Sequence, residues 1–415
     1  MAVYTQLTGE ALQKKYESCK QKYDYYKTLG LKLDMSRGKP GADQLDLSNG
    51  LLSALSPEDY LAEDGTDCRN YGGIDGIPEM KRLFADLMDV RPDEVFTGGN
   101  ASLTLMYESV ISFCLSGSKD KRKFLCPSPG YDRHFAIAEY LGIEMITIPM
   151  TQDGPDMAEV RKYVSDPAVV GIWCVPVYSN PQGVVYSDET IKAMAALKPA
   201  AADFRIFWDN AYIIHSFDGE PPKIANILRE CEKQGAYDMP LVFTSFSKVS
   251  FPGAGVCAMA ASPANLTKMR SHMIIQTIGP DKLNQLRHVR FYKDADGVHR
   301  HMQKQAEILR RKFAVVLDEL AAGLEGKGIG SWLSPKGGYF VSFDTLPGCA
   351  KRTIALCAEA GLVMTPAGAT YPYGCDPKDS NIRIAPTFPP LEQLKQAMEL
   401  FCAAVEVAAL EKLLL

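Results

Sequence analysis

Six short apolar runs in the middle of the chain constrain its fold more than any other feature of the sequence. They lie at 123–127, 144–150, 169–177, 204–209, 240–246 and 255–262. Several are almost continuously apolar, as strands buried on both faces of a sheet must be. Helical patterns such as 101–115 and 188–198 separate most of them. Strand–helix alternation of this kind predicts an α/β domain with a mostly parallel central sheet flanked by helices.

A different pattern follows and predicts a smaller α+β domain. A charged helical tract covers 283–324, with an interruption expected at Asp296-Gly297. Short runs at 337–344 and 381–387 then alternate with helices near 350–361 and 390–414. The N-terminal part holds a helix at 9–28 and a Gly/Pro-rich stretch, and it could fold back onto this unit. A chain of 415 residues is too long for one core. We therefore expect an N-terminal segment at 1–50 packing with the small domain, a large domain at 51–300 and a small domain at 301–415.

Composition excludes several classes of partner. The net charge of −5 gives no electrostatic case for nucleic acid or an anionic membrane. No apolar run reaches the roughly 18–20 residues of a membrane span, and the first twenty residues lack the pattern of a secretory signal. Eleven scattered cysteines without a CxxC pair predict buried free thiols and a cytoplasmic protein. No Cys/His cluster predicts a metal site, and His299 and His301 are expected on the surface.

Lys248 lies between two apolar runs, where burying a lysine would be costly without a chemical function. It follows the run at 240–246, in the segment FTSFSKVSFPGAGVCAM. An amine desolvated among apolar neighbours has a lowered pKa and becomes nucleophilic, so it can form a Schiff base with an aldehyde. A lysine on an exposed edge or loop would leave the same pattern. Lys248 alone does not decide between these interpretations.

Two further polar positions follow buried strands. Asp209 ends the run at 204–209, and ligands of parallel sheets bind beyond the carboxyl ends of the strands. A buried carboxylate there would keep a pyridine nitrogen protonated, as pyridoxal phosphate requires, although a helix cap would also explain an aspartate. Tyr212 could donate a hydrogen bond to the phenolic oxygen of that cofactor. Asn180 lies in an Asn-Pro-x-Gly turn after another strand and could bind the same oxygen.

A glycine-rich turn and an arginine complete the set. In FTGGNASLTLM at 96–106, glycines lead into an amphipathic helix, whose free amides can bind phosphate. The turn is neither a Walker A sequence nor GxGxxG. Arg383 lies in the run at 381–387 and could clamp a carboxylate with both prongs of its guanidinium. A common turn and a surface arginine would explain either feature separately, so only their combination points to a site.

The order of these residues resembles that of class I and II aminotransferases, which bind pyridoxal phosphate on fold type I. The resemblance covers essentially the whole chain: the glycine-rich helix start, Tyr131, Asn180-Pro-x-Gly, Asp209-x-x-Tyr212, Ser245-x-x-Lys248 and Arg383. The segments SRGKP, GGNASLTLM, SFSKVSFPGAG and TIGPDKLNQLRHVRF are similar to a divergent bacterial group of aspartate aminotransferases related to the effector domains of MocR regulators. No helix-turn-helix precedes the domain, which disfavours a regulator.

The resemblance implies three catalytic residues. Lys248 would carry pyridoxal 5'-phosphate and later act as the acid and base of the proton shift. Asp209 would pair with the pyridinium nitrogen, and Tyr212 would hold the phenolic oxygen. The aldehyde cofactor would delocalise the electron pair left at the substrate Cα when the proton leaves. Two half-reactions, one after the other, would give ping-pong kinetics.

The resemblance also implies a set of binding residues. The cofactor contacts would be Asn100, Ala101, Ser102 and Ser245 at the phosphate, Tyr131 stacked on the ring, His134 behind Asp209, and Asn180 at the phenolic oxygen. Tyr71, in YGGIDG, would reach the phosphate of the neighbouring subunit, which implies a homodimer with shared active sites. Arg383 would clamp the α-carboxylate, with Gly38, Arg37 and Asn180 as further substrate residues.

Gly255 departs from the family pattern. Many members have an arginine here that pairs with the cofactor phosphate, whereas this chain reads Pro252-Gly253-Ala254-Gly255. A phosphate dianion without a cation is costly in a dry pocket. We therefore expect either binding by dipoles alone or a replacement, for which Lys282, Thr277 and Arg37 are the candidates.

Aspartate and 2-oxoglutarate are the substrates that the subgroup resemblance favours. A second cation for the distal carboxylate could be Arg37, Arg133, Arg270 or Lys282, and the sequence does not choose among them. A related pyridoxal-phosphate enzyme with aromatic or broad specificity, or with lyase activity, is the main alternative. A non-catalytic ligand-binding or regulatory protein on the same scaffold is a remote one.

Overall fold

An eight-stranded sheet organises the larger half of the chain. The computed structural model describes residues 3–115 and 121–415, and the strand order is β2-β9-β8-β7-β6-β3-β4-β5. The five strands β8, β7, β6, β3 and β4 run parallel, and β2, β9 and β5 join antiparallel. Their bounds are β2 Val95–Thr97, β3 Lys123–Ser128, β4 Glu144–Thr151, β5 Gly154–Pro155, β6 Val169–Cys174, β7 Arg205–Asp209, β8 Pro240–Ser245 and β9 Cys257–Ala260. This arrangement confirms the predicted α/β fold with a mostly parallel sheet.

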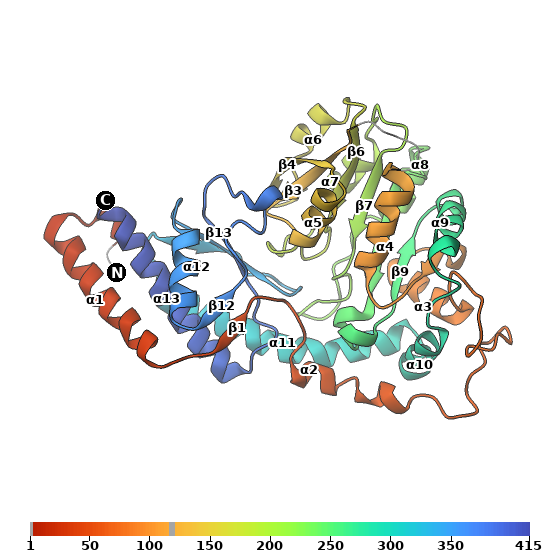
Figure 1. Ribbon diagram of the computed structural model, residues 1–415, viewed down its shortest axis with the longest axis horizontal. Coiled ribbons are helices and arrows are strands. Elements are labelled where there is room, and N and C mark those ends of the chain that lie inside the picture. The colour runs from red at the N-terminus through yellow and green to blue at the C-terminus, as the bar shows by residue number, and fades with distance from the viewer. Residues whose placement is uncertain (1–2, 116–120) are drawn as a thin grey trace.

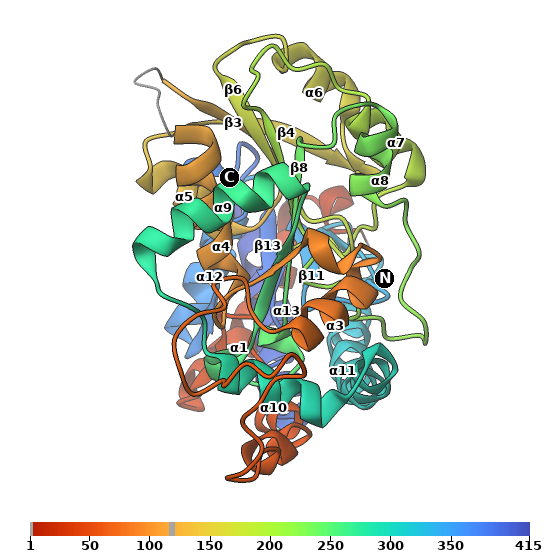
Figure 2. The same cartoon turned by 90° about the vertical axis from the view of Figure 1, so that its right-hand side faces the viewer.

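Helices accompany this sheet, and α4 to α8 lie between its strands along the chain. They are α2 Ala42–Asp46, α3 Pro78–Met88, α4 Ser102–Ser109, α5 Asp132–Tyr140, α6 Met157–Tyr163, α7 Asp188–Ala195, α8 Ile227–Lys233, α9 Pro263–Gln276 and α10 Lys282–Tyr292. Figure 2 shows α7 and α8 side by side and α9 lying across the front of the view. The run at 101–115 forms α4 and then one π-helical turn at Val110–Leu115.

The smaller half contains both ends of the chain. Its elements are α1 Gly9–Thr28, β1 Leu33–Met35, α11 Ala295–Leu324, β10 Gly330–Trp332, β11 Val341–Thr345, α12 Ala350–Glu359, β12 Leu362–Met364, β13 Asn381–Ile384 and α13 Leu391–Leu413. The strands β10, β11 and β13 form an antiparallel sheet, and β1 pairs in parallel with β12. Helix α1 packs along α13 (Figure 1).

The buried apolar side chains form two clusters that meet at the long helix α11. One cluster runs from Ala62 to Met302 around the large sheet. The other joins side chains of the N-terminal segment, such as Tyr23, to those of α11–α13. Helix α11 crosses from one half to the other (Figure 1), so the boundary expected at residue 300 lies inside this helix.

Two local predictions were wrong, and a short strand was missed. The interruption of the long helical tract falls at Lys293 and Asp294 rather than at Asp296-Gly297, because the Asp294 side chain caps α11 by accepting from the Gly297 amide. His301 is buried rather than exposed, and its ring nitrogen contacts the Val249 carbonyl at 2.9 Å. Strand β2 was missed, because three residues are too short to show a periodic pattern.

Candidate active site

A cavity of about 190 Å³ lies where the parallel strands of the large sheet end. Asp209 is the last residue of β7, and Ser245 is the last residue of β8. The other lining residues are Ala101, Ser102, Leu103, Met106, Tyr131, Val175, Asn180, Ala211, Tyr212, Ser247 and Lys248. Eight of the residues predicted from the sequence thus line one cavity, at the edge of the sheet where parallel α/β proteins bind ligands.

Lys248 projects into this cavity from a short 3₁₀ turn directly after β8. Its Nζ lies 5.1 Å from the ring centroid of Tyr212 and 5.8 Å from that of Tyr339. Burial lowers the pKa of Lys248; the Asp209 carboxylate opposes this shift and the Arg383 charge adds to it. Lowering the pKa increases the share of neutral amine, which is the nucleophilic form.

Asp209, which lines the cavity, forms a buried pair with His134. His134 Nε2 lies 3.0 Å from Asp209 Oδ2, and the imidazole stacks on Trp173 with ring centroids 4.4 Å apart. Asp209 Oδ1 is buried and has no hydrogen-bond partner. An unsatisfied buried carboxylate oxygen is costly, so this atom is ready to accept from a ligand donor such as a protonated ring nitrogen.

The cavity also offers hydroxyl groups and a helix start. Helix α4 begins at Ser102, so its first amides lack partners within the helix. Ser245 Oγ and Ser247 Oγ are 3.1 Å apart, and Ser247 Oγ donates to the Asn100 carbonyl at 2.9 Å. Asn100 itself does not line the cavity but supports Ser247 from behind. Ser247 was not singled out from the sequence, although a hydroxyl next to Lys248 could have been.

The structure explains why position 255 is a glycine. A Cβ added to Gly255 would come within 3.1 Å of the Ser247 amide nitrogen and 3.2 Å of the Asn100 carbonyl oxygen. Because these are backbone atoms, the backbone itself would have to shift by a few tenths of an ångström to admit the Cβ. Lys248 is the only cationic side chain among the residues that line the cavity, and the candidate replacement Lys282 instead donates to the carbonyl oxygens of Asn70 and Gly72 at 2.8 and 2.7 Å.

Arg383 approaches the cavity from the small sheet. It lies on β13, is 6% exposed, and donates through Nη1 to Asp132 Oδ1 at 2.7 Å and to Asn180 Oδ1 at 3.2 Å. Because Asn180 lines the cavity, this contact places the guanidinium at its edge. Asp132, which opens α5, was missed by the sequence reasoning, since acids in the first turn of a helix are common.

Several predicted residues are not brought into the cavity. Tyr71 is 80% exposed on a loop, and Arg37 is also exposed. Gly38 packs instead against the Phe340 ring, where an added Cβ would come within 2.5 Å of the ring edge. The Phe340 ring centroid lies 4.8 Å from the Arg383 guanidinium, so Gly38 is one side chain away from that arginine. Among the described residues no group of His, Cys, Asp and Glu could hold a metal ion.

The chain is similar to known proteins over almost its whole length, and this similarity identifies its family. Residues 7–415 match the family described as aspartate amino-transferase. The chain belongs to the aspartate aminotransferase family. It is 42% identical to an aspartate aminotransferase of Corynebacterium glutamicum over 95% of this chain and 94% of the relative.

Solved structures agree with this family. An aspartate transaminase from Corynebacterium glutamicum superposes with a TM-score of 0.96 at 41% identity, covering 99% of each chain. The fold is shared more widely, since LysN, an α-aminoadipate aminotransferase from Thermus thermophilus complexed with N-(5'-phosphopyridoxyl)-L-leucine, superposes with a TM-score of 0.75 at 19% identity over 92% of each chain. The predicted fold type I is therefore confirmed, and membership of the aspartate aminotransferase family confirms the predicted cofactor, pyridoxal 5'-phosphate.

The cavity fits this cofactor on its own chemistry. It provides an amine with a lowered pKa for the aldehyde and an unpartnered buried carboxylate oxygen for the pyridine nitrogen. Two serine hydroxyls and a helix start are available for the phosphate. The chain is a pyridoxal-phosphate-dependent aminotransferase. No helix among its described residues is long and apolar enough to cross a membrane.

Proposed function

We propose that the chain transfers an amino group between L-aspartate and 2-oxoglutarate by a ping-pong mechanism. The observation that carries the site assignment is the convergence of Lys248, Asp209 and Arg383 on one cavity and its edge. The choice of aspartate rests on the relatives named aspartate aminotransferase, since the cavity itself shows no second cation. Buried cysteines without a disulfide among the described residues favour a cytoplasmic location, and the net charge of −5 favours small-molecule substrates over nucleic acid.

Each residue has a defined task in the proposed reaction. The cofactor, when bound, supplies an electron sink for the bond that breaks at the substrate Cα. Asp209 Oδ1 would accept from the ring nitrogen and keep it protonated, while His134 fixes the other carboxylate oxygen. Tyr212 and Asn180 would hold the phenolic oxygen, and Tyr131 would cover the ring. Lys248 would hold the aldehyde, and its Nζ, when free, would take up and return the proton of the substrate Cα.

The phosphate is held by neutral donors from this chain. Ser102 and Ser245 offer hydroxyls, while the Ser247 hydroxyl already donates to the Asn100 carbonyl, and the first amides of α4 carry the positive end of the helix dipole. Gly255 leaves room for the close approach of its own backbone to the backbone of Ser247 and Asn100, which border these donors. This is the first of the two options foreseen for the missing arginine, binding by dipoles alone.

A homodimer completes the proposed site. The Tyr71 loop packs against the segment that follows α9: Lys282 binds two of its carbonyls, and a Cβ on Gly279 would come within 2.7 Å of the Gly72 oxygen. At the end of α9 and directly after it, Ile274, Ile275 and Ile278 are 67%, 87% and 63% exposed. Such a patch favours contact with a second subunit, where Tyr71 would reach the partner's phosphate. Ile275→Asp should yield monomers in analytical ultracentrifugation, whereas Val363→Asp, exposed on β12, should not; dimers in both variants would refute this interface.

Two exposed arginines are the remaining candidates for the distal carboxylate. Arg270 already pairs with Asp75 at 2.9 Å, and Lys282 is occupied by the Tyr71 loop. Arg37 and Arg133 are exposed, and neither forms an ion pair with another described residue. Arg37→Ala and Arg133→Ala, assayed with aspartate and alanine, should reveal which variant loses the preference for aspartate.

A panel of amino acids tests the substrate assignment. The visible absorption of the bound cofactor should shift on adding aspartate or glutamate, and Lys248→Ala should lose both the absorption band and turnover. Conversion by aromatic amino acids alone would favour the broad-specificity alternative, and a colourless protein that ignores added cofactor would refute both.

A further inference from the structure

Arg383 makes its two shorter hydrogen bonds within the chain through one nitrogen, Nη1. Nη1 donates to Asp132 Oδ1 and to Asn180 Oδ1, at 2.7 and 3.2 Å. Nη2 has a single long contact of 3.5 Å to Thr365 Oγ1, and Nε is buried without any partner. The Nε and Nη2 nitrogens together form the edge of a guanidinium that binds a carboxylate with two parallel hydrogen bonds. Asp132 and this edge therefore do not compete for the same nitrogens.

The Nε–Nη2 edge, which makes only the long hydrogen bond to Thr365 among the described residues, is where a substrate carboxylate can bind. A buried N–H group without an acceptor is unfavourable, so a ligand that supplies the acceptor is favoured. The α-carboxylate can take Nε and Nη2 while Asp132 stays on Nη1. Two carboxylates then share one guanidinium, and the pair formed by Arg383 and Asp132 has no net charge before the substrate arrives.

We propose that Asp132 is a positioning residue that holds Arg383 by its Nη1 end and, through its negative charge, limits how tightly the enzyme binds carboxylate ligands. This inference rests on the proposed role of Arg383 at the α-carboxylate. Each half-reaction releases an acid of the same class that it consumed, so tight binding of carboxylates would delay product release. The Asp132 side chain is 30% exposed, which screens its charge but does not remove it.

Asp132→Asn separates charge from hydrogen bonding. The amide oxygen of asparagine still accepts from Nη1, so the guanidinium stays in place while the repulsion disappears. A repulsion of this kind, between charges on opposite ends of one guanidinium at a partly screened site, corresponds to roughly a tenfold change in affinity. The variant should bind succinate, which has two carboxylates and no amine, about tenfold more tightly than the natural protein.

Calorimetric titration of the holoenzyme with succinate is the direct measurement. Glu139→Gln, which removes an exposed charge from the other end of α5, is the matched control and should leave the affinity unchanged. The kinetic counterpart is a lower KM for both amino acid and oxo acid together with a lower kcat, because products leave more slowly. Thermal melting of the two variants checks that both are folded.

Arg383→Gln distinguishes failure of this inference from failure of the proposed site. If Arg383→Gln leaves succinate binding unchanged, the carboxylate does not bind there and the proposed site itself is wrong. If Arg383→Gln abolishes binding while Asp132→Asn binds succinate no better than the natural protein, the site stands and the role of Asp132 is refuted. Tighter binding in Asp132→Asn with unchanged Glu139→Gln supports the inference.

Discussion

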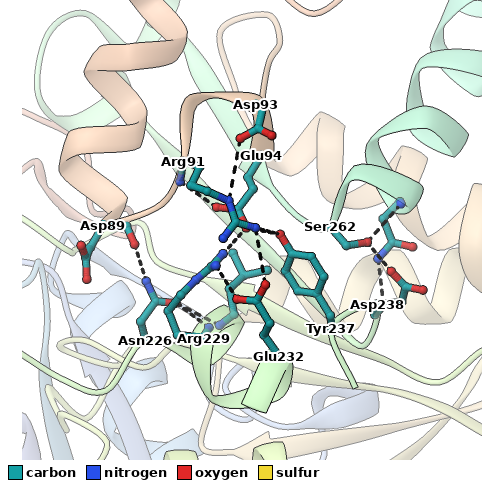
Figure 3. A network of polar contacts seen from close by, with 12 residues as sticks. Asp89, Arg91, Asp93, Glu94, Asn226, Arg229, Glu232, Tyr237, Asp238 and Ser262 are labelled. Carbon is teal, nitrogen blue, oxygen red and sulfur yellow. Dashed lines mark hydrogen bonds and ion pairs between the residues drawn. The ribbon is translucent and has the colours of Figure 1, made fainter. Parts of the chain in front are cut away.

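Replacing Glu94 by glutamine should destabilise the large half of the protein through a buried charged network. Glu94 is fully buried just before β2. Its carboxylate accepts from the Arg229 guanidinium, from the Tyr237 hydroxyl and, at 2.7 Å, from the Arg91 amide, and it lies 2.9 Å from Arg91 Nη2. Figure 3 shows these side chains converging on one carboxylate. Through Arg229 the network ties α8 to the edge of the sheet.

The size of the effect follows from the exposure of the partners. Breaking a fully buried ion pair costs about 3–5 kcal/mol. Here the Arg91 and Arg229 side chains are 49% and 25% exposed, so water still solvates their charges, and glutamine keeps an acceptor oxygen. We expect a loss of about 2 kcal/mol, or about 4–8 °C in melting temperature for a unit of this size.

The loss should depend on pH with a defined sign. Burial raises the pKa of Glu94, but hydrogen bonds from Tyr237, the Arg91 amide and Arg229 outweigh it, so the net pKa is lowered from 4.5. The stabilisation is therefore complete above pH 4.5 and is lost as pH falls through the lower folded-state pKa.

Calorimetry and hydrogen exchange of the α8 amides measure this effect. Asp93→Asn is the matched control, because the Asp93 side chain is 73% exposed and its contact with Arg91 Nε is long, at 3.9 Å. This variant should therefore melt within about 2 °C of the natural protein. Equal melting temperatures for Glu94→Gln and the natural protein at pH 7 would refute the reasoning, as would an equal loss in both variants.

Three further predictions concern the site and its surroundings. Gly255→Ala should weaken cofactor binding about tenfold, because the new Cβ meets backbone atoms and overpacking costs about 1–3 kcal/mol; equilibrium dialysis measures it, and unchanged affinity contradicts the packing account. Burial and the nearby Lys248 charge lower the pKa of His215 to about 3, so the unfolded state takes up this proton first as pH falls below 6.5. His215→Leu should therefore reduce the pH slope of stability between pH 6.5 and 4 by about 1.4 kcal/mol per pH unit, and an identical slope in denaturant titrations would count against it. Lys282→Met removes both hydrogen bonds to the Tyr71 loop, so amide exchange at residues 70–73 should accelerate at least tenfold. An unchanged exchange rate at these residues would show that Lys282 does not hold the loop.

The residues at strand ends were the ones that the sequence could place. Lys248 and Asp209 follow long apolar runs, and the ends of parallel strands necessarily meet at one edge of a sheet. Their presence in one cavity therefore follows from pattern and topology. The roles of Lys248, Asp209 and the other site residues remain predictions that the experiments above address.

Contacts between residues far apart in the sequence could not be predicted from the pattern of apolar runs. The partner of Arg383 is 251 residues away in sequence, and nothing in the first turn of α5 marks Asp132 as that partner. Lys282 was considered as a phosphate ligand, yet it is engaged by carbonyl oxygens of the Tyr71 loop. Backbone carbonyls leave no trace in the residue pattern, so such engagement becomes visible only once the loops are folded.

The pairing of β1 with β12 has a consequence for the order in which the protein can be made. Met35 is the partner of Met364, so the first strand leaves the ribosome about 330 residues before the strand that completes it. At roughly 5–20 residues per second, the N-terminal segment waits on the order of 15–65 s. During that time the apolar side of α1, including Leu12 and Tyr23, has no α13 to cover it. The nascent large half can fold meanwhile, and the exposed N-terminal helix is the part of the growing chain where we expect chaperones to bind.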